Sequence, residues 1–273
     1  MKRTSLLPNL QLASLALMAL LTASGLAGCV APPAAEDPRE IRTVSDMTDA
    51  DRRSRVRLEL ASAYFGRGQM TTALDEVKLA LLAKPDMPEA LNLRGLIYAT
   101  LGEPRLAEDS FQRALQLAPR DGDSLQNYAW FLCQQRRFPE ADQLFERALA
   151  LPQYQGAVRT LLAQGVCQAR AGLLPQAQLT LTKSYDLDPS SPVTAFSLSD
   201  VLYRRGEYER ARFYIARVNA QPDASNAQTL WLAARTEQRL GNSATAQMFG
   251  RQLRERFPQS AEALQFERGR FDD

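Results

Sequence analysis

The sequence predicts an all-α fold, a stack of six helix hairpins. This prediction rests on a small residue that recurs about every 34 residues, and on a glycine and a proline that recur at fixed distances from it. Such a period indicates hairpins that share a continuous core by stacking, because one hairpin alone cannot bury its apolar face. The recurring residues are Ala73, Ala107, Ala141, Ala177, Ala211 and Ala246, at intervals of 34, 34, 36, 34 and 35 residues.

Each repeat also contains the signals that end its two helices. A glycine lies five residues before the alanine, where the first helix must stop and reverse, which favours a left-handed backbone. A proline about twelve residues after the alanine ends the second helix, since it cannot continue the hydrogen-bond ladder. The glycines are Gly68, Gly102, Gly172, Gly206 and Gly241, with Arg136 as the exception; the prolines are Pro85, Pro119, Pro152, Pro189, Pro222 and Pro258.

Two further columns of residues predict how the helices pack. Small residues on the first helices allow two helices to cross closely, and large residues four places after the recurring alanine are expected to fill the space between hairpins. Gly250 breaks the second column, so we expect the sixth repeat to pack least well. The small residues are Ala61, Gly95, Ala129, Gly165, Ser199 and Ala234; the large ones are Val77, Phe111, Phe145, Leu181 and Ile215.

With these columns the chain resembles the tetratricopeptide-repeat family, and residues 88–121 are close to its consensus. The resemblance implies a right-handed superhelical stack over residues 51–260. We expect a C-terminal capping helix at 261–273, where Leu264, Phe266 and Phe271 would cover the last repeat. The six repeats are expected at about 54–87, 88–121, 122–157, 158–191, 192–226 and 227–260.

The first residues have the features of a secretory signal: Lys2 and Arg3, an apolar stretch, and small residues before Cys29. The ending Leu-Ala-Gly-Cys resembles the lipobox of bacterial lipoproteins, which implies cleavage of residues 1–28 and acylation of Cys29. Val30 follows, rather than the aspartate associated with inner-membrane retention, so the resemblance implies an outer-membrane anchor facing the periplasm. The alternative is an uncleaved anchor, although the apolar stretch is shorter than the roughly 20 residues that span a bilayer.

Residues 29–50 are expected to hold the acylated cysteine and a flexible tether. This segment contains Pro32, Pro33 and Pro38 among small and acidic residues, a composition that cannot build a core.

The composition argues against catalysis, metal binding and nucleic-acid binding. The net charge is +2 and the chain has no histidine, which removes the commonest general base and metal ligand. Acidic pairs such as Glu207 and Glu209 stand beside arginine on predicted helix surfaces, and no phosphate-binding loop pattern occurs. We therefore expect no enzyme, no cofactor besides the covalent lipid on Cys29, no metal, no small-molecule substrate and no nucleic-acid partner.

Two local stretches indicate a closer resemblance to one group of repeat proteins. They are residues 127–133, Asn-Tyr-Ala-Trp-Phe-Leu-Cys, and residues 165–167, Gly-Val-Cys, with the run from Leu187 to Tyr214. With the lipobox and six repeats, the chain resembles the type IV pilus biogenesis and stability lipoproteins, the PilF/PilW pilotin family. Ala129 replaces a glycine usual in that family. The resemblance implies a scaffold that assists outer-membrane localisation and multimerisation of the type IV pilus secretin. The alternative is a scaffold of another envelope machine, such as outer-membrane protein insertion or peptidoglycan remodelling.

The same resemblance supports a disulfide between Cys133 and Cys167, on the first helices of neighbouring repeats. The periplasm permits one, and acylation of Cys29 leaves only these two of the three thiols. Two separate buried thiols remain the alternative.

A partner-binding groove is expected on the first helices of the first three repeats, formed by Leu58, Phe65, Leu96 and Trp130. Helical spacing keeps such residues on one stripe, where tetratricopeptide stacks receive peptides. The corresponding positions in repeats four to six are more often charged or polar. The alternative is that the four residues belong to the hairpin core. The charged and polar positions include Arg159, Asp200, Arg204, Arg235 and Gln238.

Overall fold

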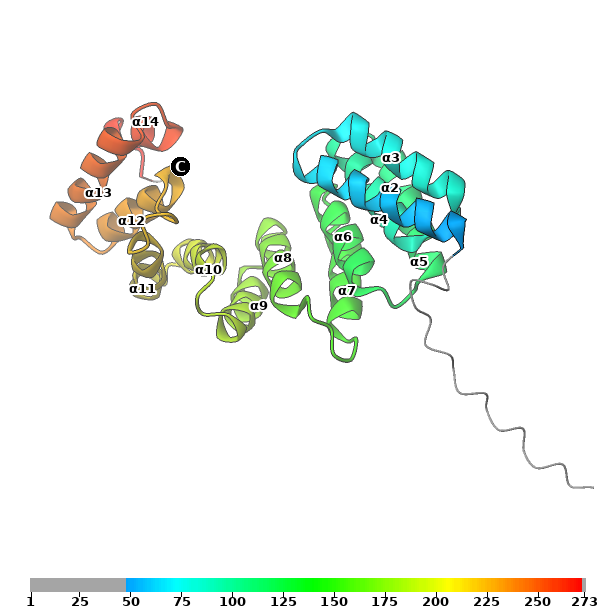
Figure 1. Cartoon of the computed structure of the whole chain (residues 1–273). Coiled ribbons are helices and arrows are strands. Elements are labelled where there is room, and N and C mark those ends of the chain that lie inside the picture. Colours follow the sequence, from blue (N-terminus) through cyan, green and yellow to red (C-terminus); the bar gives the residue numbers. More distant parts are fainter. Residues whose placement is uncertain (1–47, 272–273) are drawn as a thin grey trace, which may run out of the picture. The chain divides into compact units, whose positions relative to one another are not determined.

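The structure, a computed structural model, describes residues 48–271 and contains thirteen α-helices and no strand in that range (Figure 1). The predicted all-α fold is confirmed. The helices are α2 (Asp49–Gly66), α3 (Met70–Ala83), α4 (Pro88–Thr100), α5 (Pro104–Leu117), α6 (Gly122–Gln134), α7 (Phe138–Leu149), α8 (Ala157–Arg170), α9 (Leu174–Leu187), α10 (Pro192–Arg204), α11 (Tyr208–Asn219), α12 (Ala227–Arg239), α13 (Ser243–Arg256) and α14 (Ala261–Glu267).

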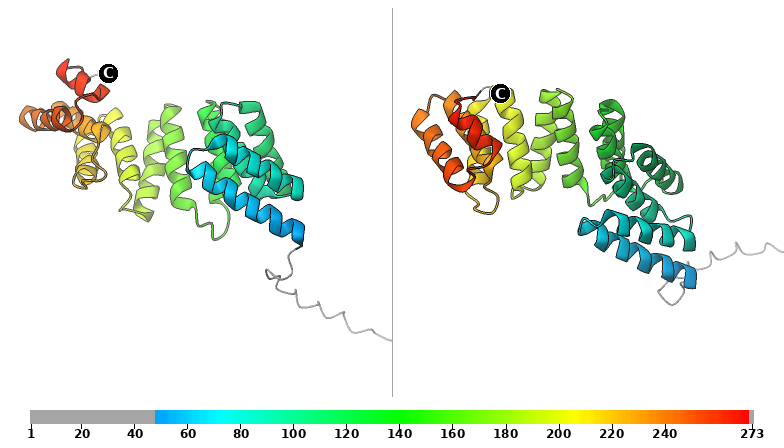
Figure 2. Two further views of the ribbon diagram at one scale, coloured as in Figure 1. Left: turned by 45° about the horizontal axis from the view of Figure 1, so that its top comes forward. Right: turned by 90° about the horizontal axis from the view of Figure 1, so that it is seen from above.

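Consecutive helices pair into six hairpins, from α2–α3 to α12–α13, which follow one another in chain order (Figures 1 and 2). The second helix of each hairpin packs against the first helix of the next. First helices of successive hairpins also contact one another, so they form one face of the stack. Helix α14 packs against both α12 and α13 and thereby covers the last hairpin.

Every hairpin turns through the same hydrogen-bonded cap. After α2, the N–H of Gly68 donates to the carbonyl of Phe65 (2.9 Å) and the N–H of Gln69 to that of Tyr64 (2.9 Å). This pair of bonds needs a left-handed residue after the helix, and Gly68 has a φ of 74°. The other turn glycines have φ between 78° and 80°. Arg136 takes the same conformation, φ 61°, so the repeat geometry is kept where the glycine is missing.

The recurring small residues lie at the closest helix contacts. All six recurring alanines are fully buried, as are the large residues four places later. A Cβ atom on Gly95 would lie 2.7 Å from the ring of Phe111, and one on Gly165 would lie 2.6 Å from Cγ of Leu181. Larger residues at these two positions would therefore push the two helices of a hairpin apart.

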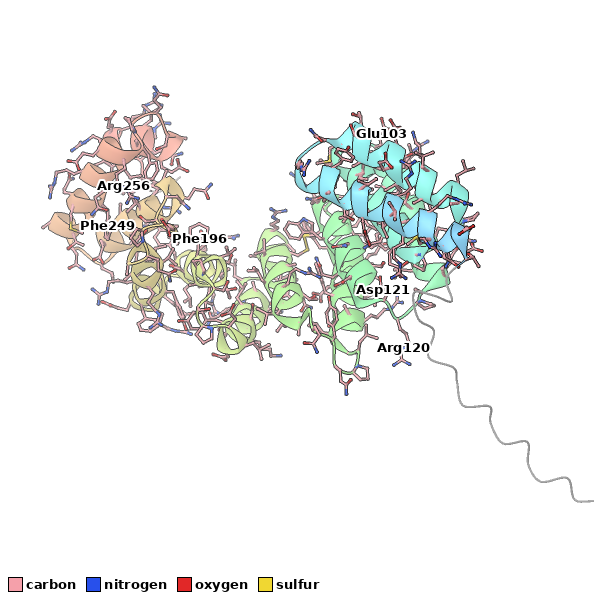
Figure 3. The ribbon with its side chains drawn as sticks, viewed as in Figure 1. Glu103, Arg120, Asp121, Phe196, Phe249 and Arg256 are labelled. Atoms are coloured by element: carbon pink, nitrogen blue, oxygen red, sulfur yellow. A yellow bond between two sulfur atoms is a disulfide. The ribbon has the colours of Figure 1, made fainter. Side chains whose placement is uncertain are left out.

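At Gly250 the expected weak packing is not found, because a residue outside the repeats fills the gap. A Cβ atom on Gly250 would lie 1.8 Å from the Phe266 ring, so this ring of α14 takes the place that a large side chain of the second helix holds in each of the other hairpins. Phe266 is only 6% exposed and packs edge-on against Trp231. Phe249 (Figure 3) contacts the apolar clusters on both sides of it, so the last hairpins share a core.

The first helix is longer than the repeat period predicts and begins inside the segment expected to be a tether. Thr48 caps α2: its hydroxyl accepts the N–H of Asp51 (3.1 Å), and the Asp51 carboxylate accepts the N–H of Thr48 (3.3 Å). Such a reciprocal cap satisfies two backbone donors at the start of a helix. Helix α2 therefore starts at Asp49, ahead of the repeat boundary predicted near residue 54.

Candidate protein-binding surface

The six first helices, α2, α4, α6, α8, α10 and α12, form the face that we call the first-helix face. Its residues stand three before, one after and four after the recurring small residue of each first helix, since these spacings lie on one side of a helix. Leu58 and Phe65 of α2, Leu96 of α4 and Trp130 of α6 all occupy such positions. The four predicted groove residues therefore lie on the same side of three neighbouring first helices.

All four side chains are half-buried rather than fully open. Leu58 and Phe65 pack against the N-terminal apolar cluster around Val77, and Leu96 and Trp130 pack against the next cluster, around Phe111. Each residue therefore contributes to a core and also exposes part of its surface. Truncating any of these side chains is therefore expected to lower stability as well as to change the surface, because removing apolar contacts from a cluster costs stability.

Trp130 is partly covered by a cation. The guanidinium of Arg170, on α8, lies 4.9 Å from the centre of the Trp130 ring, a geometry in which the positive charge interacts with the ring face. Beside it, the side-chain amide of Asn127 donates to that of Asn92 (3.2 Å) and links α6 to α4. The apolar stripe thus ends at Trp130 in a polar and basic margin.

A cavity of about 520 Å³ continues the first-helix face where α6, α8 and α10 meet. At its edge Arg159 forms an ion pair with Asp123 (2.6 Å), and Leu162 and Thr194 contribute to its lining. Both charged side chains are more than half exposed, so solvent screens this pair. Charged, polar and apolar side chains thus line this cavity together.

Three aromatic residues of the first-helix face were missed by the sequence analysis: Phe196 and Tyr203 on α10, and Trp231 on α12 (Figure 3 labels Phe196). Phe196 and Trp231 stand three residues before the recurring small residue, as Leu58 does, and Tyr203 stands four after, as Phe65 does. The helical positions that predict the N-terminal stripe therefore also predict these three aromatic residues. The C-terminal half of the face is aromatic as well as charged.

One carboxylate lies among these aromatic and basic side chains. Burial raises the pKa of Asp200 above its ordinary value, and the positive charges of Arg204 and Arg235 oppose this effect. Arg204 lies 3.7 Å from Asp200 and also donates to the carbonyl of Ala169 on α8 (3.0 Å). These contacts join α8 and α10 along the first-helix face.

In repeats two, three and four, the residue that follows the recurring alanine accepts hydrogen bonds from the next repeat. Glu108 accepts hydrogen bonds from the Tyr128 hydroxyl (2.8 Å) and from Arg137 (2.6 Å). The carboxylate of Asp142 accepts from Gln164 and Gln168 on α8, both at 2.9 Å. In the following repeat, Gln178 accepts from Arg205 (2.6 Å).

Cys133 on α6 and Cys167 on α8 are joined in the structure, with Cα atoms 5.8 Å apart. This separation lies within the usual range for a disulfide. Both residues are buried, at 1% and 3% exposure. The geometry therefore permits the bond predicted from the sequence, and its formation stays a prediction.

The predicted lipid-attachment residue, Cys29, lies outside the described residues. Within residues 48–271, no helix has the length and apolar character required to cross a membrane. The same residues contain no group of three histidine, cysteine or carboxylate side chains placed to hold a metal ion.

Comparison with known proteins identifies the family. Tetratricopeptide-repeat models match residues 88–121 and 122–151. The type IV pilus assembly protein PilF of Pseudomonas aeruginosa is 30% identical over 252 residues, which cover 92% of this chain and 97% of that protein. This chain belongs to the PilF/PilW family. The resemblance inferred from the sequence is thereby confirmed.

Solved structures of two family members agree with this assignment. The structure of Pseudomonas aeruginosa PilF is 28% identical with a TM-score of 0.72, covering 82% of this chain and all of that one. PilW, a widely conserved type IV pilus biogenesis factor, is 28% identical with a TM-score of 0.74, covering 78% of this chain and 97% of that one. The stack of helix hairpins is therefore the fold of the family, and this chain is a tetratricopeptide-repeat scaffold.

Proposed function

We propose that this protein is an outer-membrane lipoprotein scaffold of type IV pilus biogenesis, which acts as a pilotin and assembly chaperone for the secretin. The observation that carries the proposal is the similarity to PilF, which extends over 92% of this chain and nearly all of that protein. The first-helix face supports it physically, because a stripe of half-exposed apolar side chains suits an extended or amphipathic segment of a client.

The anchor proposed for this function is an acylated Cys29 followed by a tether. Several acyl chains bury enough methylene groups, at about 0.8 kcal/mol each, to hold a protein stably in a membrane. Mass spectrometry of the mature protein should find an N-terminal acylated Cys29. A Cys29→Ala variant should be mis-sorted, whereas an intact chain beginning at Met1 in outer-membrane fractions would contradict the proposed anchor.

A deletion strain tests the function itself. We expect loss of twitching, fewer surface pili and loss of heat-stable secretin multimers, all restored by the wild-type gene. Normal multimers and pili in the deletion strain would exclude the secretin role. A scaffold role in another envelope machine would then become the leading hypothesis.

The binding surface is tested with Phe65→Ser and Trp130→Ser in the purified protein. Aromatic side chains usually dominate such contacts, so each change should weaken secretin binding by more than about 1 kcal/mol. Phe213→Ser is the matched control, because Phe213 is 55% exposed on α11, away from the first-helix face. Since Phe65 and Trp130 also pack against the core, binding is compared below the melting temperature of each variant. Unchanged binding by the folded variants would place the groove elsewhere.

A further inference from the structure

At the C-terminal end of the first-helix face, Tyr203, Trp231 and Arg235 lie together and Phe271 packs against them; we call these three residues the aromatic pocket. Trp231 of α12 is stacked on Phe271, with ring centres 5.4 Å apart and planes 28° apart. The hydroxyl of Tyr203, on α10, donates to the backbone carbonyl of Phe271 (3.4 Å). The guanidinium of Arg235 lies over both rings of the pocket, 4.7 Å from the centre of Tyr203 and 5.6 Å from that of Trp231.

The tail reaches this pocket through a sharp turn after α14. Gly269 has a φ of 64°, its N–H donates to the carbonyl of Phe266 (3.0 Å), and the next N–H donates to that of Gln265 (3.0 Å). This is the same cap that ends each first helix, and it stops the helix and reverses the chain. Phe271 thus lies in a non-helical segment laid against α10 and α12.

The two phenylalanines of this region have different roles. Phe266 is almost fully buried and fills the space beside Gly250, so it completes the core of the last hairpin. Phe271 is only half-buried and touches Phe266 edge-on, with ring centres 5.7 Å apart. The contacts of Phe266 with Gly250 and Trp231 do not involve Phe271. Apart from a local bond from its N–H to the carbonyl of Gly269 (3.2 Å), Phe271 is held by one ring stack, one ring edge and the bond from Tyr203 to its carbonyl. Any aromatic residue of an extended segment can make the last three contacts.

The charged side chains near this pocket indicate which kind of segment would bind there. Arginines border this face in three successive first helices, one residue beyond its last position: Arg170, Arg204 and Arg239. The corresponding residues of the first three repeats are uncharged: Gly66, Thr100 and Gln134. With Arg235 beside the pocket and Asp200 as the opposing acid, this half of the face is basic, which favours an acidic segment. In the chain itself, two aspartates follow Phe271 in sequence.

We propose that the pocket formed by Tyr203, Trp231 and Arg235 binds an aromatic side chain from an extended, acidic segment of a partner protein. Phe271 holds the pocket until the partner displaces it. This site is separate from the stripe proposed to bind the secretin in the first three repeats, and its test does not use the secretin. The two proposals can therefore fail independently.

The test uses fluorescence anisotropy with the mature protein and a labelled peptide, Ser-Gly-Gly-Phe-Asp-Asp, which repeats the Phe-Asp-Asp order of residues 271–273. A tethered side chain competes at an effective concentration on the order of millimolar. For a peptide with a Kd of about 100 µM, the Phe271→Ala variant should therefore bind roughly tenfold more tightly than the wild type. Phe213→Ala, which changes an exposed aromatic of α11, should bind as the wild type does.

Two further comparisons test the chemistry. The same peptide with alanine for phenylalanine should not bind Phe271→Ala, and one with two lysines for the aspartates should bind at least fivefold more weakly. Adding Tyr203→Phe, which keeps the ring but removes the donor to the carbonyl, should weaken binding several-fold. If Phe271→Ala lowers the helical signal, Phe271→Leu replaces it, since leucine keeps apolar volume without the ring stack. Equal affinity of the folded variant and wild type, or equal binding of the alanine peptide, would overturn the proposal.

Discussion

Replacing Arg136 by glycine should stabilise this protein, because Arg136 is the one hairpin turn residue with a side chain in a left-handed backbone. Its φ is 61°, and its N–H donates to the carbonyl of Cys133, three residues earlier (3.1 Å). The glycine N–H of each other turn donates to the carbonyl three residues before it in the same way. A left-handed conformation costs a residue with a Cβ atom about 1–2 kcal/mol. Glycine avoids that cost but loses more backbone entropy on folding, by roughly 0.5–1 kcal/mol. The central values of the two ranges, about 1.5 and 0.75 kcal/mol, leave an expected net gain of about 0.75 kcal/mol.

The measurement is thermal unfolding followed by circular dichroism. For a chain of this size a gain of 1 kcal/mol corresponds to roughly 2–4 °C, so the melting temperature should rise by about 1–4 °C. Gly206→Arg is the reverse control: its φ is 78°, and a Cβ atom there would have nothing within 4 Å, so only the backbone cost is added. A lower melting temperature for Arg136→Gly, or no loss for Gly206→Arg, would refute the reasoning.

Three other outcomes are expected. Joint replacement of Cys133 and Cys167 by serine should lower the free energy of unfolding by up to about 4 kcal/mol on the chain-entropy model; labelling of two free thiols in the denatured, unreduced wild type would show that the bond does not form. Burial, with Glu108 as a further cause, raises the pKa of Tyr128 to about 12. Tyrosine ionises near 10 when unfolded, so its contribution to stability is present below pH 10 and lost as pH rises towards 12. Melting temperatures between pH 8 and about 11 should therefore fall less steeply for Tyr128→Phe, and parallel curves would contradict this assignment. Gly250→Ala should displace the Phe266 ring and lower the melting temperature, whereas an unchanged value would mean that α14 adjusts without loss.

The repeat pattern predicted the fold because its signals act locally. A glycine or proline ends a helix through its own backbone, and a small residue permits a close crossing wherever it recurs. The position of Arg136 was also predictable, since its neighbours fix the turn. By contrast, the side chain that fills the space beside Gly250 is Phe266 of α14, a helix that belongs to no repeat. No periodicity indicates which outside side chain will fill a gap.

For the binding surface, the sequence predicted on which side of a helix a residue lies better than how exposed its side chain is. Leu58 and Trp130 lie on the expected face, but how far they are covered depends on neighbours such as Arg170, which comes from another helix. The aromatic residues Tyr203 and Trp231 follow the same register and were obscured by the charged residues around them. The contact between Phe271 and Trp231 depends on a turn that returns the chain to α12, and the repeat pattern does not extend to it.

Glu108, Asp142 and Gln178 each accept hydrogen bonds from the next repeat, so the repeats that they join cannot be exchanged freely. An apolar surface accepts any neighbour of suitable shape, whereas these bonds pair a carboxylate with a phenol and a guanidinium, a carboxylate with two amides, and an amide with a guanidinium. A repeat beside the wrong neighbour would leave the partly buried carboxylate of Glu108 or Asp142 without these partners, at a cost of up to about 1–3 kcal/mol, the range for a fully buried group. The order of repeats two to five is thus encoded at their three junctions, so excising repeat three or four would bring together residues that do not form these bonds.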